Sequence, residues 1–274
     1  MEGAAEQEDV HVVLDNIHPE ARVVVEREGA DPVELEASAF SLRRSSTITV
    51  PAGELLTGIL MAGDLTESSR EEEFQVFMDL LDNSPVPMAL TPGNHDVYDP
   101  VLPYFNQNFG PGNVAFDVCR THVAMLDTGS GSIAPSVLGR LPELFSRGDS
   151  EFSVAVMHHV PYPETTGQGW SDEDAGFMTL GEFALQGGDL VVAGHAHLAR
   201  DFGALPLPAG SPRQIVVGTA GAAQGVGRPL YGYARVTFSA ELDVCFVEVP
   251  APGQQPRSSE AIEAESGFRA CATP

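Results

Sequence analysis

The chain has 274 residues and a formal net charge of −25, which comes from 39 acidic and 14 basic residues. At this length it can form one or two globular domains, and the absence of an apolar run of about 18 residues excludes a predicted membrane-spanning helix. A strongly acidic surface repels phosphate backbones and anionic lipids, which argues against non-specific binding to nucleic acids or membranes. Because the opening MEGAAEQEDV lacks the basic and apolar parts of a signal peptide, we expect a cytoplasmic protein.

The first fifty residues are rich in β-branched and alternating residues, which predict strands at 11–14, 21–25, 33–39 and 46–50. Residues 51–249 instead alternate short apolar strands with helical patterns, and they are interpreted as the catalytic domain. Strands are expected there at 58–62, 87–90, 114–118, 122–127, 152–157, 189–193, 214–219, 231–238 and 242–249, with helices at 70–82 and 135–146. Residues 250–274 are rich in Pro, Gly, Gln, Ser and Glu and predict a disordered tail.

Four of these apolar strands end in loops that carry polar residues able to bind metal or move a proton. These residues are Asp64, Asn94, His95, His158, His195 and His197. In open α/β sheets the carboxyl ends of strands are where sites assemble. Carboxylate, amide and imidazole donors without a thiolate suit Mn, Fe or Zn. Two such ions about 3.5–4 Å apart can hold a phosphoryl group for in-line attack by a metal-bound hydroxide.

The loops carry four motifs in order: Gly63-Asp64-Leu65-Thr66, Gly93-Asn94-His95-Asp96, His158-His159 and Gly194-His195-Ala196-His197. Their order resembles the signature of the calcineurin-like metallophosphoesterase family over about residues 57–249. The resemblance implies an α/β fold in which two packed mixed β-sheets are flanked by helices, the αββα sandwich. It also implies metal-dependent hydrolysis of a small phosphoester, monoester or diester, with a leaning toward the phosphodiesterase-like branch.

The same resemblance implies a role for each residue in a binuclear metal site. Asp64 bridges two divalent ions, one of which is completed by Asn94, His158 and His195. His197 belongs to the other ion. His95 stabilises or protonates the leaving oxygen, and Asp96 orients the His95 ring. His159 is interpreted as a neighbour without a metal role.

The chain departs from the family at the first motif, an Asp-x-His at the end of the first strand. Asp9-Val10-His11 matches the pattern but precedes its strand, whereas Asn16-Ile17-His18 follows a strand with Asn in place of Asp. The favoured interpretation is that residues 1–50 are an unrelated or rearranged β segment, which leaves the His197 site weak or empty. The alternative function is therefore a metal-impaired relative that acts as a binding or scaffold module.

The cysteines and the segment 161–176 can be interpreted without a role in the metal site. Cys119, Cys245 and Cys271 are odd in number and widely spaced, so they predict two core thiols and one tail thiol rather than a disulfide framework. The segment 161–176 is either a rim loop in which Trp170 contacts a leaving group or a solvated loop with one packed Trp.

Overall fold

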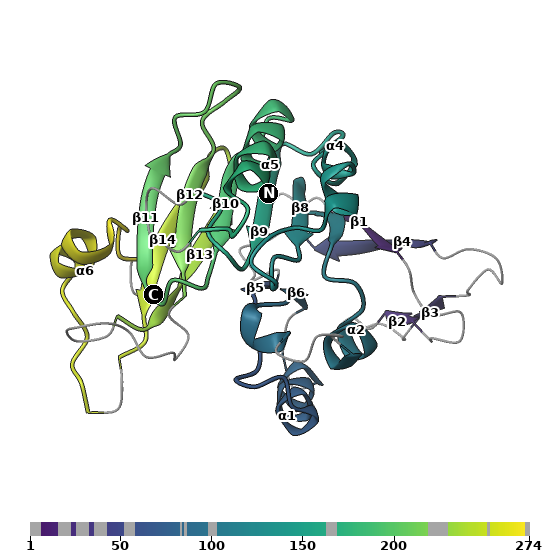
Figure 1. The fold of residues 1–274 in the computed structure, drawn as a ribbon, viewed down its shortest axis with the longest axis horizontal. Helices are drawn as coiled ribbons and strands as arrows, with labels where there is room; N and C mark the ends of the chain where they lie inside the picture. Colours follow the sequence, from purple (N-terminus) through teal and green to yellow (C-terminus); the bar gives the residue numbers. More distant parts are fainter. Residues whose placement is uncertain are drawn as a thin grey trace, which may run out of the picture.

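The computed structural model describes residues 58–82, 84, 87–97, 103–162, 169–218, 230–250 and 253–271, together with the backbone of four strands before residue 52. Its centre is a six-stranded mixed sheet (Figure 1). The strand order is β11 (Ala199–Ala204), β12 (Arg213–Val217), β10 (Leu190–Ala193), β9 (Phe152–Met157), β8 (Thr121–Leu126) and β7 (Val114–Val118). The four inner strands are parallel, and both edge strands are antiparallel to their neighbours.

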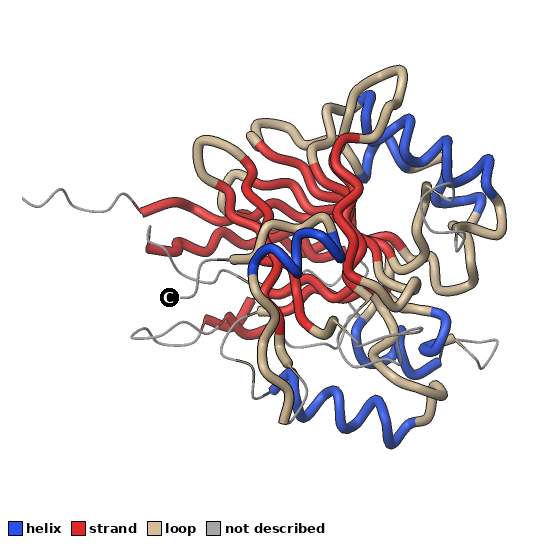
Figure 2. Tube along the Cα trace, turned by 90° about the vertical axis from the view of Figure 1, so that its left-hand side faces the viewer, coloured by secondary structure: helices blue, strands red, loops and turns tan. Residues whose placement is uncertain are grey.

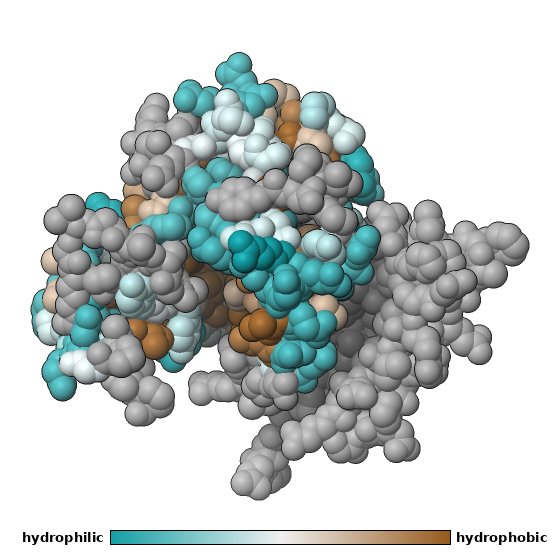
Figure 3. Space-filling view, turned by 60° about the horizontal axis from the view of Figure 1, so that its bottom comes forward, coloured by the Kyte–Doolittle hydropathy of each residue, from teal (hydrophilic) through white to brown (hydrophobic). Residues whose placement is uncertain are grey.

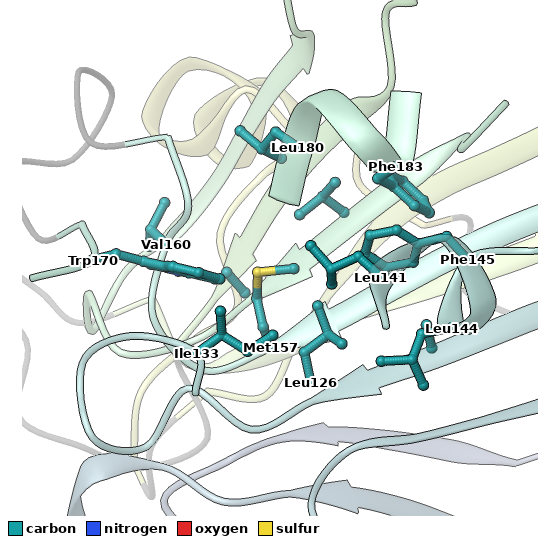
Figure 4. Close-up of a cluster of buried hydrophobic side chains, with 14 of the residues drawn as sticks. Leu126, Ile133, Leu141, Leu144, Phe145, Met157, Val160, Trp170, Leu180 and Phe183 are labelled. Carbon is teal, nitrogen blue, oxygen red and sulfur yellow. The ribbon is translucent and has the colours of Figure 1, made fainter. Parts of the chain in front are cut away.

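The inner strands are buried on both faces, which is why they read as continuous apolar runs in the sequence. In β9, Ala155 and Met157 point into one hydrophobic core, whereas Val154 and Val156 point into the other. The first core lies under the helices α3 (Pro135–Leu138), α4 (Leu141–Leu144) and α5 (Glu173–Leu185). Figure 4 shows the side chains of this core, and Figure 2 shows the strands in the centre with helices outside them.

The second core separates the central sheet from a further layer of strands. This layer contains the antiparallel pair β13 (Gly232–Phe238) and β14 (Leu242–Glu248) and the parallel pair β5 (Ile59–Ala62) and β6 (Met88–Thr91). Helices α1 (Glu71–Asp82) and α2 (Pro103–Phe109) pack on each other through phenylalanine rings. The layers confirm the predicted α/β fold of packed sheets flanked by helices.

The segment after residue 252 is ordered and packed, so the prediction of a disordered tail is wrong for residues 253–271. Helix α6 (Ser259–Ser266) buries Ile262, and Phe268 follows it into the second core. Among the described residues of this segment, Ile262 and Phe268 are the large apolar side chains in the core, and two are too few to show a helical pattern among polar residues. Their burial nevertheless fixes the segment beside β11 and β14.

A disulfide between Cys245 and Cys271 joins this segment to β14, so the expectation of unlinked thiols at these positions is also wrong. The segment runs along β14 as a parallel bridge, with the Phe246 amide donating to the Arg269 carbonyl at 2.9 Å. Twenty-six residues separate the two cysteines, and only the fold brings them together. Cys119 is half-buried and lies outside this disulfide.

The four strands expected before residue 52 are present in the backbone. β1 (Gln7–Asp15) pairs with β4 (Arg43–Pro51), and β2 (Val23–Val25) pairs with β3 (Val33–Leu35), both antiparallel. Within the described part of the chain, none of the four pairs with β5 or β6.

The described surface shown in Figure 3 is mostly hydrophilic, with small separate hydrophobic patches. None of the helices that the structure describes is long and apolar enough to cross a bilayer.

Candidate metal centre

The turns that follow β5 and β6 cross at two glycines. A Cβ atom on Gly63 would lie 2.6 Å from the Gly93 amide nitrogen, and a Cβ atom on Gly93 would lie 2.2 Å from Oδ1 of Asp64. Gly63 also has φ of +85°, a conformation that side chains disfavour. The two turns can therefore touch only because both motifs begin with glycine, and the contact places Asp64 beside Asn94.

The buried side chain of Asp96 connects these two turns by hydrogen bonds. Its carboxylate accepts hydrogen bonds from the amides of Gly93 (2.8 Å), Leu65 (3.1 Å) and Thr66 (2.9 Å), and from the Thr66 hydroxyl (2.9 Å). Burial raises the pKa of Asp96 above its ordinary 3.8, although these hydrogen bonds act to lower it. Asp96 therefore supports the backbone of both loops, and its expected role in orienting the His95 ring stays a prediction.

Four predicted ligands come together at the ends of β5, β6, β9 and β10. Oδ1 of Asn94 lies 2.9 Å from Nε2 of His158 and 2.9 Å from Nδ1 of His195. The two imidazole nitrogens are 3.2 Å apart, and Oδ2 of Asp64 lies 3.3 Å from Nε2 of His158. Ligand atoms bonded to one ion at about 2.1 Å lie about 3–3.4 Å apart, so the spacing fits a single divalent ion.

The protonation pattern of this group also fits a cation. Nδ1 of His158 donates to the Ala62 carbonyl at 2.7 Å, which leaves the lone pair of a neutral ring on Nε2. That lone pair faces the carboxylate of Asp64 and the amide oxygen of Asn94. Lone pairs from several acceptors repel one another unless a proton or a metal ion lies between them. A carbonyl that orients a ligand histidine is a common support of metal sites.

The local charges agree with this arrangement. Burial acts to raise the pKa of Asp64, but the contact with His158, the hydrogen bond from the His95 amide and the positive charge that the two rings carry when protonated hold it below the ordinary 3.8. Burial and the charge of His158 lower the pKa of His195 to about 4. Both side chains are therefore in the metal-binding form, carboxylate and neutral imidazole, near neutral pH.

His197 lies outside the group of four. It shares the turn after β10 with His195, and the two residues have φ of 47° and 57°, with φ of 56° at Asp64. The His197 ring is half-buried, and its charge is among the causes that lower the pKa of His195, so the two side chains are near each other. The assignment of His197 to a second ion stays a prediction.

His95 is fixed by hydrogen bonds of its ring and backbone. Its Nδ1 lies 2.8 Å from the Glu67 carbonyl and so acts as a donor, and its amide donates to Oδ1 of Asp64 at 3.0 Å. The His95 carbonyl accepts from the hydroxyls of Thr66 and Ser69. With Nδ1 engaged, Nε2 is the ring nitrogen suited to exchange a proton with a substrate.

The His158-His159 pair is held from two sides. The Thr128 hydroxyl accepts from the amides of His158 (3.1 Å) and His159 (2.9 Å), and the Trp170 indole donates to the His159 carbonyl at 3.0 Å. Trp170 is 3% exposed and lies beside Val160 and Ile133 (Figure 4). The packed alternative for Trp170 is thus the one that agrees with the structure.

The structure also brings His159 to the site, which the sequence analysis did not expect. The three rings of His158, His159 and His195 each offer a nitrogen within 4.8 Å of the other two. The signal was present in the sequence as adjacent histidines after one strand. His159 was interpreted as a neighbour without a metal role, but its ring centroid lies 5.0 Å from that of His158 and 4.0 Å from that of His195.

The candidates for the missing first motif are not tested. Asn16 and His18 lie outside the described residues. Asp9 and His11 lie in β1, where the backbone pairs with Thr49 and Thr47 of β4. Among the described strands, β1 pairs with β4 alone and not with β5, the strand that leads into the Asp64 turn.

The fold and the donor group define an α/β protein with a candidate metal centre at the carboxyl ends of its strands. The profile of the calcineurin-like phosphoesterase family matches residues 57–199, more than half of the chain, and the chain belongs to this family. The curated proteins contain no match.

Among solved structures, the chain is similar to the purple acid phosphatase PPD1 isolated from yellow lupin (Lupinus luteus) seeds. The TM-score is 0.56 at 14% identity, and the match covers 80% of this chain and 49% of that one. The chain thus spans about half the length of the phosphatase. At this identity, the likeness shows a shared fold.

Proposed function

We propose that the chain hydrolyses phosphoester bonds of small substrates with divalent ions held by Asp64, Asn94, His158 and His195. The observation that carries the proposal is the spacing of their donor atoms, 2.9–3.3 Å between neighbours, at the ends of four strands. Membership of a phosphoesterase family supports the same reaction class. Mn, Fe and Zn all suit this donor set.

The charge of the site favours an anionic substrate. A bound divalent ion would neutralise phosphoryl charge and activate water for attack. Asp64 is the one carboxylate among the four donors, while Asn94 and the two imidazoles are neutral ligands. The filled site therefore keeps a net positive charge, which attracts a phosphoester in spite of the −25 charge of the whole chain.

His95 is the residue that we assign to the leaving group. The Glu67 carbonyl and the Asp64 carboxylate fix its ring and backbone next to the metal ligands. A proton on Nε2 would pass to the leaving oxygen as the ester bond breaks. We further propose that Asp64 and His197 hold a second ion, and that this ion binds more weakly because the chain has no clear first-motif carboxylate to complete its ligands.

Hydrolysis of p-nitrophenyl phosphate and bis-p-nitrophenyl phosphate by metal-free protein with added Mn²⁺ tests the proposal. We expect metal-dependent turnover of at least one ester, lost together with bound metal in Asp64→Ala. Asp79→Ala, which changes an exposed carboxylate on α1, is the matched control and should keep both. Absence of metal binding by the unchanged protein would refute the enzyme and favour a binding or scaffold role.

A further inference from the structure

We propose that His159 is a metal ligand, so that three imidazoles, from His158, His159 and His195, hold one divalent ion of this centre. The inference rests on the proposed metal-dependent function and adds a ligand that the four motifs do not assign. Three observations support it: the position of the His159 ring, its Nδ1 atom without a hydrogen-bond partner among the described residues, and the hydrogen bonds that fix the His159 backbone.

The His159 ring lies inside the site. It is 6% exposed, and its centroid lies 4.0 Å from that of His195 and 5.0 Å from that of His158. One nitrogen from each of the three rings lies within 4.8 Å of the other two. Ligand atoms bonded to one ion at about 2.1 Å lie about 3 Å apart when they are neighbours and about 4.2 Å apart when they are opposite, so binding of all three rings requires the His159 ring to move closer to the other two.

Nδ1 of His159 needs a partner. It is buried, and among the residues that the structure describes it has no hydrogen-bond partner. A buried polar atom without a partner is costly, and such atoms in folded proteins are nearly always satisfied. The neighbouring site atoms are themselves lone-pair donors, so a cation bound at Nδ1 would give this nitrogen the partner that it lacks.

Hydrogen bonds fix the backbone of His159 on both sides of its ring. Its amide donates to Thr128 and its carbonyl accepts from Trp170, at 2.9 Å and 3.0 Å. Trp170 is itself packed in the core under α5. The ring is therefore held at the site before metal binds, as expected of a preorganised ligand.

A third imidazole has a chemical consequence for this chain. It adds a donor without adding negative charge, so the ion gains affinity and keeps its attraction for a phosphoester. This matters where Asp64 is the one carboxylate of the donor group. The competing explanation is that His159 only stacks on His195, from which it is tilted by 36°, and thereby fixes the orientation of that ring.

Two substitutions separate a ligand from a stacking ring. His159→Phe keeps an aromatic ring against His195 and removes both nitrogens, whereas His159→Ala removes the ring as well. Circular dichroism of the metal-free proteins establishes that each variant is folded. The full chain is then titrated with Co²⁺ alone, and the number of bound imidazoles is measured by X-ray absorption at the cobalt edge.

For a ligand, we expect both variants to bind Co²⁺ at least about 10-fold more weakly than the unchanged protein, with one imidazole fewer at the metal. Native affinity and an unchanged imidazole count in His159→Phe would overturn the proposal, and weakening in His159→Ala alone would assign the ring to positioning His195. If the unchanged protein binds no Co²⁺, the proposed function itself fails. If it binds Co²⁺ independently of His159, only the third ligand is refuted.

Discussion

Asp96→Ala tests whether one buried carboxylate assembles the turns that carry the metal ligands. The substitution removes the acceptor of three backbone amides and one hydroxyl, from Gly93, Leu65 and Thr66. Asp96 is 1% exposed, so water cannot replace the carboxylate without opening the structure. The two turns should then separate, and the donors Asp64 and Asn94 with them.

The magnitude follows from the number of hydrogen bonds. Each contributes about 1 kcal/mol, and a buried donor left without a partner costs about 1–3 kcal/mol. Removing the buried charge recovers part of this, because burial raises the pKa of Asp96 and so disfavours its ionised form. We therefore expect a loss of about 2–4 kcal/mol in the free energy of unfolding. Thr66→Val, which removes one hydroxyl from the same network, should cost about 1 kcal/mol.

Urea unfolding of the metal-free proteins, followed by circular dichroism, measures both changes, and Mn²⁺ titration of the folded variants measures the effect on the site. Asp96→Ala should bind Mn²⁺ more weakly than Thr66→Val does. The reasoning is refuted if the free energy of unfolding of Asp96→Ala differs from that of the unchanged protein by less than about 0.5 kcal/mol, the size of a neutral surface change, and the variant binds Mn²⁺ normally.

Three further predictions concern the proton donor, the C-terminal disulfide and the pH dependence of folding. His95→Ala should lower turnover by about 10²–10⁴-fold at unchanged metal content, and loss of metal would instead make it a ligand. Reduction of Cys245–Cys271, or Cys271→Ser, should lower the free energy of unfolding by about 3 kcal/mol, since the bond closes a loop of 26 residues; an unchanged Tm would contradict this. Burial and the charges of neighbouring histidines hold the pKa of His159 at about 4, against an ordinary 6.5, so below pH 6.5 the unfolded chain binds more protons. Protonation of His159 alone should thus cost the metal-free protein up to about 3 kcal/mol between pH 6.5 and 4, and His159→Phe should lose less stability than the unchanged protein over this range; equal losses would show that this ring does not titrate as described.

The sequence was sufficient to predict the central sheet and the four strand-end residues that the structure brings together, which we propose as ligands. Strands such as β9 and β10 are short apolar runs followed at once by His158 and His195, so both the strand and the position of its functional residue are local features. The glycines before Asp64 and Asn94 mark turns that no other residue could form at such close approach. Site residues at strand ends could therefore be named before their distances were known.

Other features depend on contacts between segments far apart in sequence. The Cys245–Cys271 bond requires α6 to fold back on β14, and a polar segment with two core residues gives no signal of that. The link between Asp96 and the Asp64 turn spans about thirty residues, so the sequence suggested a local role beside His95 instead. The inward position of His159 depends on Thr128 and Trp170, which also lie outside its own motif.

Three of the proposed metal ligands, Asp64, His195 and His197, have a left-handed backbone conformation, and this conformation affects how the protein can change under selection. Non-glycine residues pay about 1–3 kcal/mol each for such conformations, and glycine would relieve that strain. A selection for thermal stability alone would thus favour glycine at these proposed ligand positions, and the protein would gain stability while it lost the proposed metal site. Engineering a stable form of this fold therefore requires that metal retention be selected at the same time.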